Sequence, residues 1–199
     1  MGMDKATPKS KRLSPADWAD EALVAIARGG LSAVAVESLA AQLGVTKGSF
    51  YWHFADRAAL IQAALDRWEH IHTEAIIEAM DAEADATQRL RLLLRAAIGV
   101  AKVDQIEVAL LASTDEPNVA ATMARATERR IAYVAVLYEE MGLDPVAARH
   151  RAVMGVSMFL GHLQLARAAP ASLPDDDAAW HQHVDAVTDT LLDLRGSSA

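Results

Sequence analysis

The chain contains no cysteine among its 199 residues. That absence excludes a disulfide scaffold, a thiolate zinc site and a cysteine nucleophile. Aromatic residues make up only 5% of the chain, and the alternating pattern typical of strands is scarce. No uncharged apolar run reaches the ~18 residues of a membrane span, and no apolar core follows the basic N-terminus as in a signal peptide. We therefore expect a cytoplasmic protein without a membrane partner.

Hydrophobic residues, many of them alanine, form 52% of the chain, enough to bury a sizeable core. Alanine-rich amphipathic segments separated by glycine and proline favour helices throughout, so the predicted fold class is all-α with about nine helices. A three-helix N-terminal unit is expected, followed by a helical bundle. The later helices are predicted at 57–80, 87–103, 105–113, 117–141, 145–169 and 176–195.

Helix start and stop signals are clearest in the first 60 residues. Ser14 can cap a helix that has proline at its first position and Asp17 at its third. A second helix is predicted at 36–43. Gly44 then ends this helix. Thr46 can cap a short helix at 47–53, and Asp56 can cap the helix after it. A helix, a short turn with glycine and a second helix are typical of a helix-turn-helix.

Charge is distributed unevenly along the chain. The formal net charge is −8, which alone argues against a nucleic-acid partner. Residues 1–60, however, carry a net charge of +1, and residues 61–199 carry −9. Salt screens attraction to phosphate beyond roughly 8–10 Å, so a near-neutral N-terminal region can bind DNA while the acidic remainder of the chain points away.

The segment at 36–54 reads VESLAAQLGVTKGSFYWHF. Its glycine-valine-threonine turn, short helix, closing aromatic-X-His-Phe run and following basic residue resemble the DNA-binding signature of the TetR family of repressors. The resemblance covers about residues 14–60, and the remainder agrees in length and helical layout. One departure is Ala35, where many relatives have a threonine that caps the second helix and contacts phosphate.

The motif also makes physical sense without the family. Short side chains at the start of the third helix let the backbone approach base edges in the major groove, while lysine, tyrosine, histidine and arginine donate to phosphate. Backbone contacts are assigned mainly to Lys47, Tyr51, His53 and Arg57, and base or sugar contacts to Thr46, Ser49 and Trp52. Gly48 permits close approach, and Arg12 is the best candidate in an N-terminal arm. A solvated end is an equally good interpretation of that arm.

We predict a DNA-binding domain at 1–56 and a ligand-binding and dimerisation domain at 57–199. A helix-turn-helix of this size reads few base pairs, so a homodimer on a pseudo-palindromic double-stranded operator is expected, joined through the last two long helices. The resemblance implies a repressor released by a small apolar or amphipathic effector. Candidate residues for its pocket are Trp68, His72, Ile76, Met80, Ile98, Leu110, Met123, Met154, Met158 and His162, although methionine or tryptophan at helical spacing is also typical of a plain core.

Catalytic, metal and cofactor sites are not predicted. The serine at 157 lacks the glycine two residues later that a nucleophile elbow requires, and no glycine-rich phosphate loop occurs. Histidines two apart, at 70/72 and 181/183, point in nearly opposite directions on a helix and cannot chelate together. Two alternatives to the repressor stay open: a dimeric sensor or partner-binding protein without DNA binding, and a cargo-binding bundle or helical-bundle enzyme.

Overall fold

The computed structural model describes residues 13–101 and 104–194, and within these ranges every regular element is helical. The first elements are α1 (Pro15–Gly29), the 3₁₀ turn η1 (Leu31–Ala33), α2 (Val36–Gln42) and α3 (Lys47–Phe50). Next, α4 (Arg57–Glu69), the π-helical turn η2 (His70–Glu74) and α5 (Ala75–Met80) form one continuous helical rod. The chain continues through α6 (Ala86–Val100), α7 (Gln105–Leu111), α8 (Pro117–Glu140), α9 (Pro145–Ala168), the 3₁₀ turn η3 (Pro170–Ser172) and α10 (Asp177–Leu192). The all-α prediction is confirmed.

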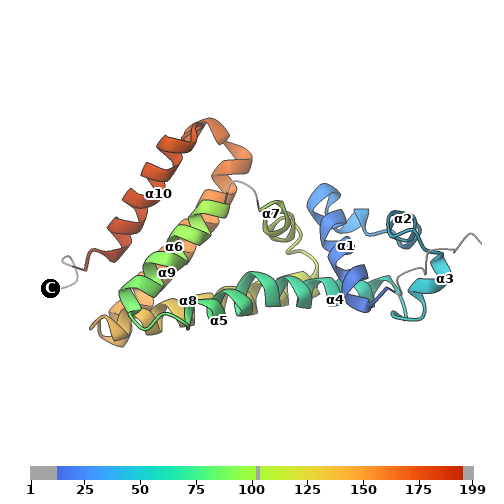
Figure 1. The fold of residues 1–199 in the computed structure, drawn as a ribbon, viewed down its shortest axis with the longest axis horizontal. Helices are drawn as coiled ribbons and strands as arrows, with labels where there is room; N and C mark the ends of the chain where they lie inside the picture. The colour runs from blue at the N-terminus through green and yellow to red at the C-terminus, as the bar shows by residue number, and fades with distance from the viewer. Residues whose placement is uncertain (1–12, 102–103, 195–199) are drawn as a thin grey trace, which may run out of the picture.

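The molecule is elongated. Figure 1 shows α1, α2 and α3 at one end, α6, α9 and α10 at the other, and α7 between them. The rod from α4 to α5 runs from the first end toward the second, with α8 along it. We call the part formed by residues 13–56 the head and the part formed by residues 57–194 the body.

Side chains cap several helix starts, two of them, at Ser14 and Asp56, as predicted. Ser14 Oγ accepts from the backbone N–H of Asp17, whose carboxylate accepts from the backbone N–H of Ser14, a reciprocal cap. Asp56 caps α4 through the N–H of Ala59, and Asp176 caps α10 through that of Ala179. Aspartate at these positions also faces the positive end of each helix dipole.

One core joins the head to the nearest part of the body. Trp18, Phe50 and Phe54 pack in the head, and the same apolar cluster contains Trp68 of α4 and Leu110 of α7. Packing therefore crosses the predicted domain boundary between residues 56 and 57. The boundary stays a prediction that separates DNA binding from ligand binding and dimerisation. A second cluster, which includes Leu94, Tyr138 and Leu191, joins α6, α8, α9 and α10.

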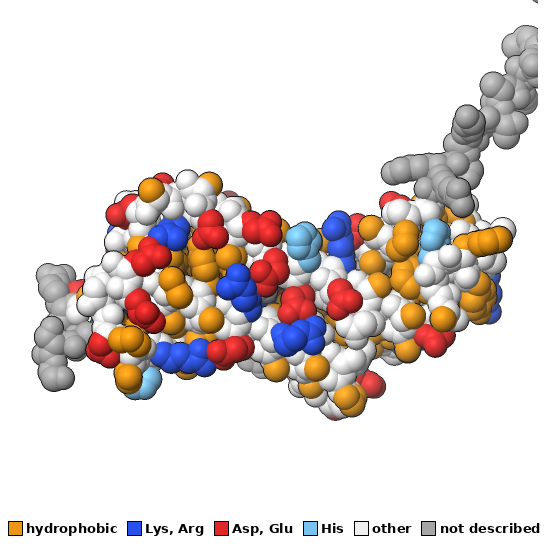
Figure 2. Space-filling model, turned by 90° about the horizontal axis from the view of Figure 1, so that it is seen from below, with side chains coloured by type: hydrophobic (Ala, Val, Ile, Leu, Met, Phe, Trp, Pro, Cys, Tyr) orange, Lys and Arg blue, Asp and Glu red, His pale blue; other side chains and the backbone are white. Residues whose placement is uncertain are grey.

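The surface differs between the two ends. On the face shown in Figure 2, acidic and basic side chains are interspersed over the body, whereas apolar side chains gather toward the end that carries the head. Ion pairs link helices of the body, among them Arg125 with Glu69, Arg129 with Glu74, and Arg149 with Glu128. No helix among the described residues is both long and apolar enough to cross a membrane.

Candidate nucleic-acid interface and internal cavity

The turn between α2 and α3 depends on Gly44. Its φ of +68° lies in the left-handed region, where a residue with a Cβ is strained. The chain thereby reverses quickly enough for the N–H of Val45 to reach the carbonyl of Ala40 at 2.9 Å. The α-helix that follows is shorter than predicted, because it ends at Phe50 and residues 51–53 continue as a turn.

The aromatic run at 50–54 divides between the inside and the outside of the head. Phe50 is fully buried, with its ring 5.4 Å from that of Trp18 and stacked on Phe54 at 5.6 Å. Tyr51 and Trp52 are 57% and 86% exposed. Burying an aromatic ring is strongly favourable, so a tryptophan left this exposed indicates a surface that another molecule covers.

Polar groups surround the two exposed rings. Thr46 stands at the first position before α3, but its side chain accepts no backbone hydrogen bond, so the predicted cap is not made. Gly48 is exposed, and a Cβ there would come no closer than 3.6 Å to Thr46 Oγ1. Ser49 and His53 are half-buried. The start of α3 thus presents small polar groups to solvent.

Lys47 is paired with an acidic neighbour from α2. Its Nζ lies 2.5 Å from Glu37 Oε1, and both side chains are well exposed. The hydrogen bond from Lys47 lowers the pKa of Glu37, and the same bond raises the pKa of Lys47. A phosphate that binds Lys47 therefore competes with this carboxylate.

Arg57 has a contact inside the protein that the sequence did not predict. Its Nε donates to the carbonyl oxygen of Val34 at 2.7 Å, and Nη2 donates to that of Leu31. Arg57 therefore holds the segment between α1 and α2 against the start of α4. As expected, Ala35 gives α2 no side-chain cap. Arg12 lies outside the described residues.

Residues 19–64 match the family model of the bacterial regulatory proteins of the TetR family. This range includes the turn, α3 and the exposed aromatic pair. This part of the chain is therefore a DNA-binding domain of the TetR family. The family resemblance predicted from the turn and the aromatic run is confirmed for these residues.

Solved structures show that this fold extends over nearly the whole chain. A transcriptional regulator from Rhodococcus sp. Rha1 is similar with a TM-score of 0.71 and 19% identity, covering 90% of this chain and 96% of that one. AibR, in complex with isovaleryl coenzyme A and operator DNA, has a TM-score of 0.66 and 18% identity, covering 92% and 98%. FadR from Bacillus subtilis, in complex with stearoyl-CoA, has a TM-score of 0.61 and 17% identity, covering 90% and 98%. At these identities the likeness concerns the fold alone.

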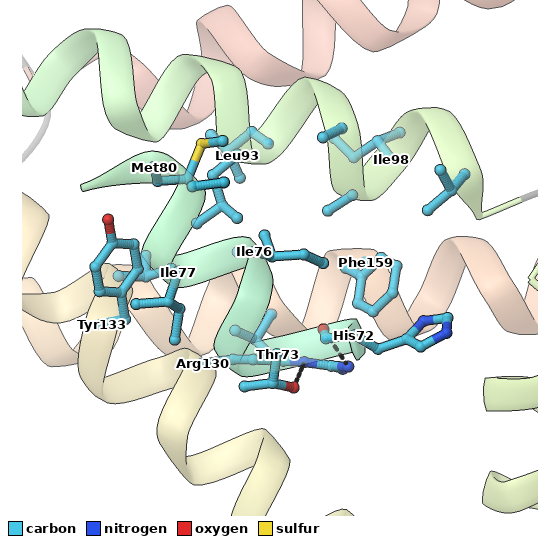
Figure 3. A pocket seen from close by; sticks show the side chains of 18 of the residues that line it. His72, Thr73, Ile76, Ile77, Met80, Leu93, Ile98, Arg130, Tyr133 and Phe159 are labelled. Carbon is cyan, nitrogen blue, oxygen red and sulfur yellow. Dashed lines mark hydrogen bonds between the residues drawn. The ribbon is translucent and has the colours of Figure 1, made fainter. Parts of the chain in front are cut away.

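The body contains a cavity of about 360 Å³ between η2, α5, α6, α7, α8 and α9. Figure 3 shows Ile76, Met80, Leu93 and Ile98 pointing into it from facing helices. Most of its wall is apolar, and its volume lies within the usual range of small-molecule sites.

Four of the ten predicted pocket residues line this cavity: His72, Ile76, Met80 and Ile98. The other six do not line it. Trp68, Leu110 and Met123 belong to the core that joins head and body, Met154 is 60% exposed, Met158 packs against the second cluster, and His162 is buried beside His183. Helical spacing in the sequence does not distinguish a wall of a cavity from a filled core, which explains the difference.

One end of the cavity is polar. Arg130 Nη1 and Nη2 donate to the two carboxylate oxygens of Glu107, at 2.5 and 3.1 Å. Its Nε donates to Thr73 Oγ1 at 3.1 Å, and Nη2 also donates to the carbonyl oxygen of His72 at 3.2 Å. Glu107 is only 1% exposed. The two residues therefore form a buried, two-pronged ion pair that links α7 to α8.

A second pair lies beside the first. His72 Nδ1 is 3.3 Å from Asp104 Oδ2, and the Asp104 side chain is 7% exposed. Asp104 also caps α7 through the N–H of Glu107. Burial raises the pKa of Asp104, but hydrogen bonds from His72 and the Glu107 backbone, with the charges of His72 and Arg130, outweigh it. The net effect lowers its pKa, so Asp104 is ionised near neutral pH.

Sequence reasoning missed Asp104, Glu107 and Arg130 as cavity residues. Asp104 has the sequence signature of a helix cap, and the other two are spaced like solvated charges on a helix surface. Only the contact between η2, α7 and α8 brings them to His72. The π-helical turn that contains His72 was one local signal of a functional site, but it is visible only in the structure.

Proposed function

We propose that the chain is a cytoplasmic homodimeric repressor that binds a pseudo-palindromic operator through the start of α3 and is released by a small molecule bound in the body. The observation that carries the DNA-binding role is the divided aromatic run, in which Phe50 is buried while Tyr51 and Trp52 are exposed. The buried ring fixes the short helix, and the exposed rings lie where the motif contacts DNA.

Within this proposal, the residues of the surface have two roles. Lys47, Tyr51 and His53 contact the DNA backbone, and Arg57 does so with the donors left after its two carbonyl bonds. Thr46, Ser49 and Trp52 face bases or sugars. The unused hydroxyl of Thr46 supports its part, because a hydroxyl can bond to either kind of base edge.

Dimerisation is proposed through the face formed by α9 and α10, with α9 supplying the exposed apolar side chains. Val146, Val153, Met154 and Leu165 are large apolar residues of α9 that remain at least 39% exposed. By contrast, Trp180, Val184 and Leu191 of α10 are buried against the same chain, so they do not supply free apolar surface. A two-fold axis at α9 would present two α3 helices to half-sites roughly 34 Å apart.

Effector release is proposed because the cavity lies beside the elements that carry the head. His72 and Thr73 of its wall continue α4, and Glu107 belongs to α7, which packs on α1. A ligand that binds more tightly to a second arrangement of these helices shifts the protein toward that arrangement. DNA affinity then falls by at most as much as the ligand prefers it over the DNA-binding arrangement. The complexes of AibR and FadR with coenzyme A thioesters support a small-molecule effector in this fold.

The test is selection of binding sites from random double-stranded DNA, followed by fluorescence anisotropy at two salt concentrations. We expect a palindrome bound by two subunits, with an affinity that falls steeply as salt rises. Trp52→Ala should weaken binding at least about tenfold without changing the melting temperature. Val136→Ala removes an apolar side chain, 49% exposed on α8, and should have no effect.

Failure to select any sequence, or equal binding by Trp52→Ala, would overturn the DNA-binding proposal. A stable dimer without DNA affinity would instead favour a sensor or partner-binding protein. A ligand that stays bound whatever the DNA does would favour a cargo-binding bundle.

A further inference from the structure

The polar end of the cavity holds more fixed negative charge than fixed positive charge. Asp104 and Glu107 contribute two carboxylates, and among the described lining residues only Arg130 carries a fixed positive charge. We propose that this end binds the protonated amine head of an amphipathic ligand whose hydrocarbon part fills the apolar cavity. This inference rests on the proposed effector role of the cavity.

Both carboxylates can accept further hydrogen bonds. An ionised carboxylate offers about four lone-pair positions. Asp104 uses its oxygens for His72 and the N–H of Glu107, and Glu107 uses one position on each oxygen for Arg130. An ammonium group has three donors and no acceptor, so it complements these positions without breaking either existing pair.

An anionic head fits poorly at the same place. Arg130 makes four hydrogen bonds, two of them to Glu107, so a ligand carboxylate would have to displace Glu107. The displaced side chain is 1% exposed and would remain buried without its partner, which is strongly unfavourable. Asp104 would repel the incoming anion as well.

Aromatic rings do not provide the cation site. The guanidinium of Arg130 lies over the ring of Trp68 at 5.4 Å and over that of Phe159 at 5.5 Å. Each contact already places a cation, Arg130, over one face of the ring. The carboxylates of Asp104 and Glu107 are therefore the groups that select the ligand.

A divalent metal ion is the competing source of positive charge. His72, Asp104 and Glu107 each place one donor atom within 4.8 Å of the others. A metal must displace any proton on His72 Nδ1 and share Glu107 with the adjacent cation Arg130. It would also leave the apolar part of the cavity without a role, whereas an amphipathic amine uses both ends.

The test compares ligands of equal chain length that differ only in the head. Octylamine, octanol and octanoate are titrated into the full-length protein at pH 8 by calorimetry, where the amine carries a proton and the acid has lost its own. We expect octylamine to bind about ten- to a hundredfold more tightly than the other two, the range for hydrogen bonds to a charged partner.

Two isosteric variants locate the site. Asp104→Asn removes one negative charge but keeps an oxygen that can cap α7, so the fold should persist, and the preference for octylamine should fall about tenfold. Glu78→Gln removes a charge from exposed Glu78 on α5, outside the cavity, and should leave the preference unchanged.

Equal or tighter binding of octanoate would overturn the inference, as would an unchanged preference in Asp104→Asn. Binding of Mn²⁺ or Zn²⁺ alone, lost in Asp104→Asn and without any preference for octylamine, would make the cluster a metal site instead. Anisotropy with selected DNA separates the two proposals. DNA binding without an amine preference overturns only the inference, and an amine preference without DNA binding overturns only the repressor.

Discussion

The head and the body use their polar groups in opposite ways. In the head, groups such as Lys47 and Trp52 lie on the outside, while a buried ring beneath them fixes the helix. In the body, Glu107 and Arg130 point inward to the end of an apolar cavity. An exposed group can be removed without unfolding the protein, whereas removing one partner of a buried ion pair leaves the other charge unpaired and destabilises the fold as well as the site.

The largest effect is expected from Phe50→Ala in the head. It removes a fully buried ring between Trp18 and Phe54 and should lower the free energy of unfolding by about 3–5 kcal/mol. Urea denaturation followed by circular dichroism measures it. Tyr51→Ala, at the next position but exposed, is the matched control and should cost under about 1 kcal/mol. Equal losses from the two variants would contradict the division of the aromatic run.

In the body, breaking the buried pair is expected to be nearly as costly. Glu107→Ala leaves Arg130 unpaired and should lower stability by about 3 kcal/mol. The double variant Glu107→Leu with Arg130→Met should recover most of this loss, because no charge is then stranded. If the double variant were as unstable as Glu107→Ala, the loss would come from packing and not from the ion pair.

Removal of the cap of α7 should have a smaller effect. Asp104→Ala takes away the acceptor for the N–H of Glu107 and should cost about 1 kcal/mol near neutral pH. Because folding lowers the pKa of Asp104, its contribution is present above the unfolded pKa of about 3.9 and is lost as pH falls through the folded value. The stability difference between Asp104→Ala and wild type should therefore disappear in strong acid. A difference that does not change with pH would show that the charge of Asp104 does not contribute to it.

The smallest effects concern DNA affinity at the pair formed by Lys47 and Glu37. Lys47→Ala should reduce the slope of log affinity against log salt by about 1, because one phosphate contact is lost. Glu37→Gln removes the competing carboxylate and should raise affinity a few-fold. Anisotropy with the selected operator measures both. An unchanged salt slope in Lys47→Ala would remove this residue from the phosphate contacts.

The two ends also differ in how far the sequence could predict them. The caps at Ser14 and Asp56 and the break at Gly44 were predicted because each depends on neighbours within a few positions. Tyr51 and Trp52 were assigned to DNA contacts, and both are exposed as that assignment requires. Arg57 was predicted to donate to phosphate, but the sequence did not predict that it also donates to the carbonyl oxygens of Leu31 and Val34.

The cavity could be predicted only in part, because its wall comes from helices far apart in the chain. Ile76, Met80 and Ile98 were candidates for the pocket that the family resemblance implies, and the same choice included Leu110 and Met123, which belong to the filled core. The polar end depends on Arg130 reaching residues 23 and 57 positions away. Such contacts follow from helix packing, which local patterns do not specify.

The central claim is that the cavity in the body controls DNA binding by the head. It is tested most directly by filling the cavity with a side chain and measuring affinity for the selected operator. Ala97→Phe on α6 points its new ring at the cavity, and Leu92→Phe, on the exposed side of the same helix, is the matched control. The account predicts that Ala97→Phe folds, dimerises and binds DNA at least about tenfold more weakly than Leu92→Phe and wild type. Equal DNA affinity for a folded Ala97→Phe protein would contradict the coupling.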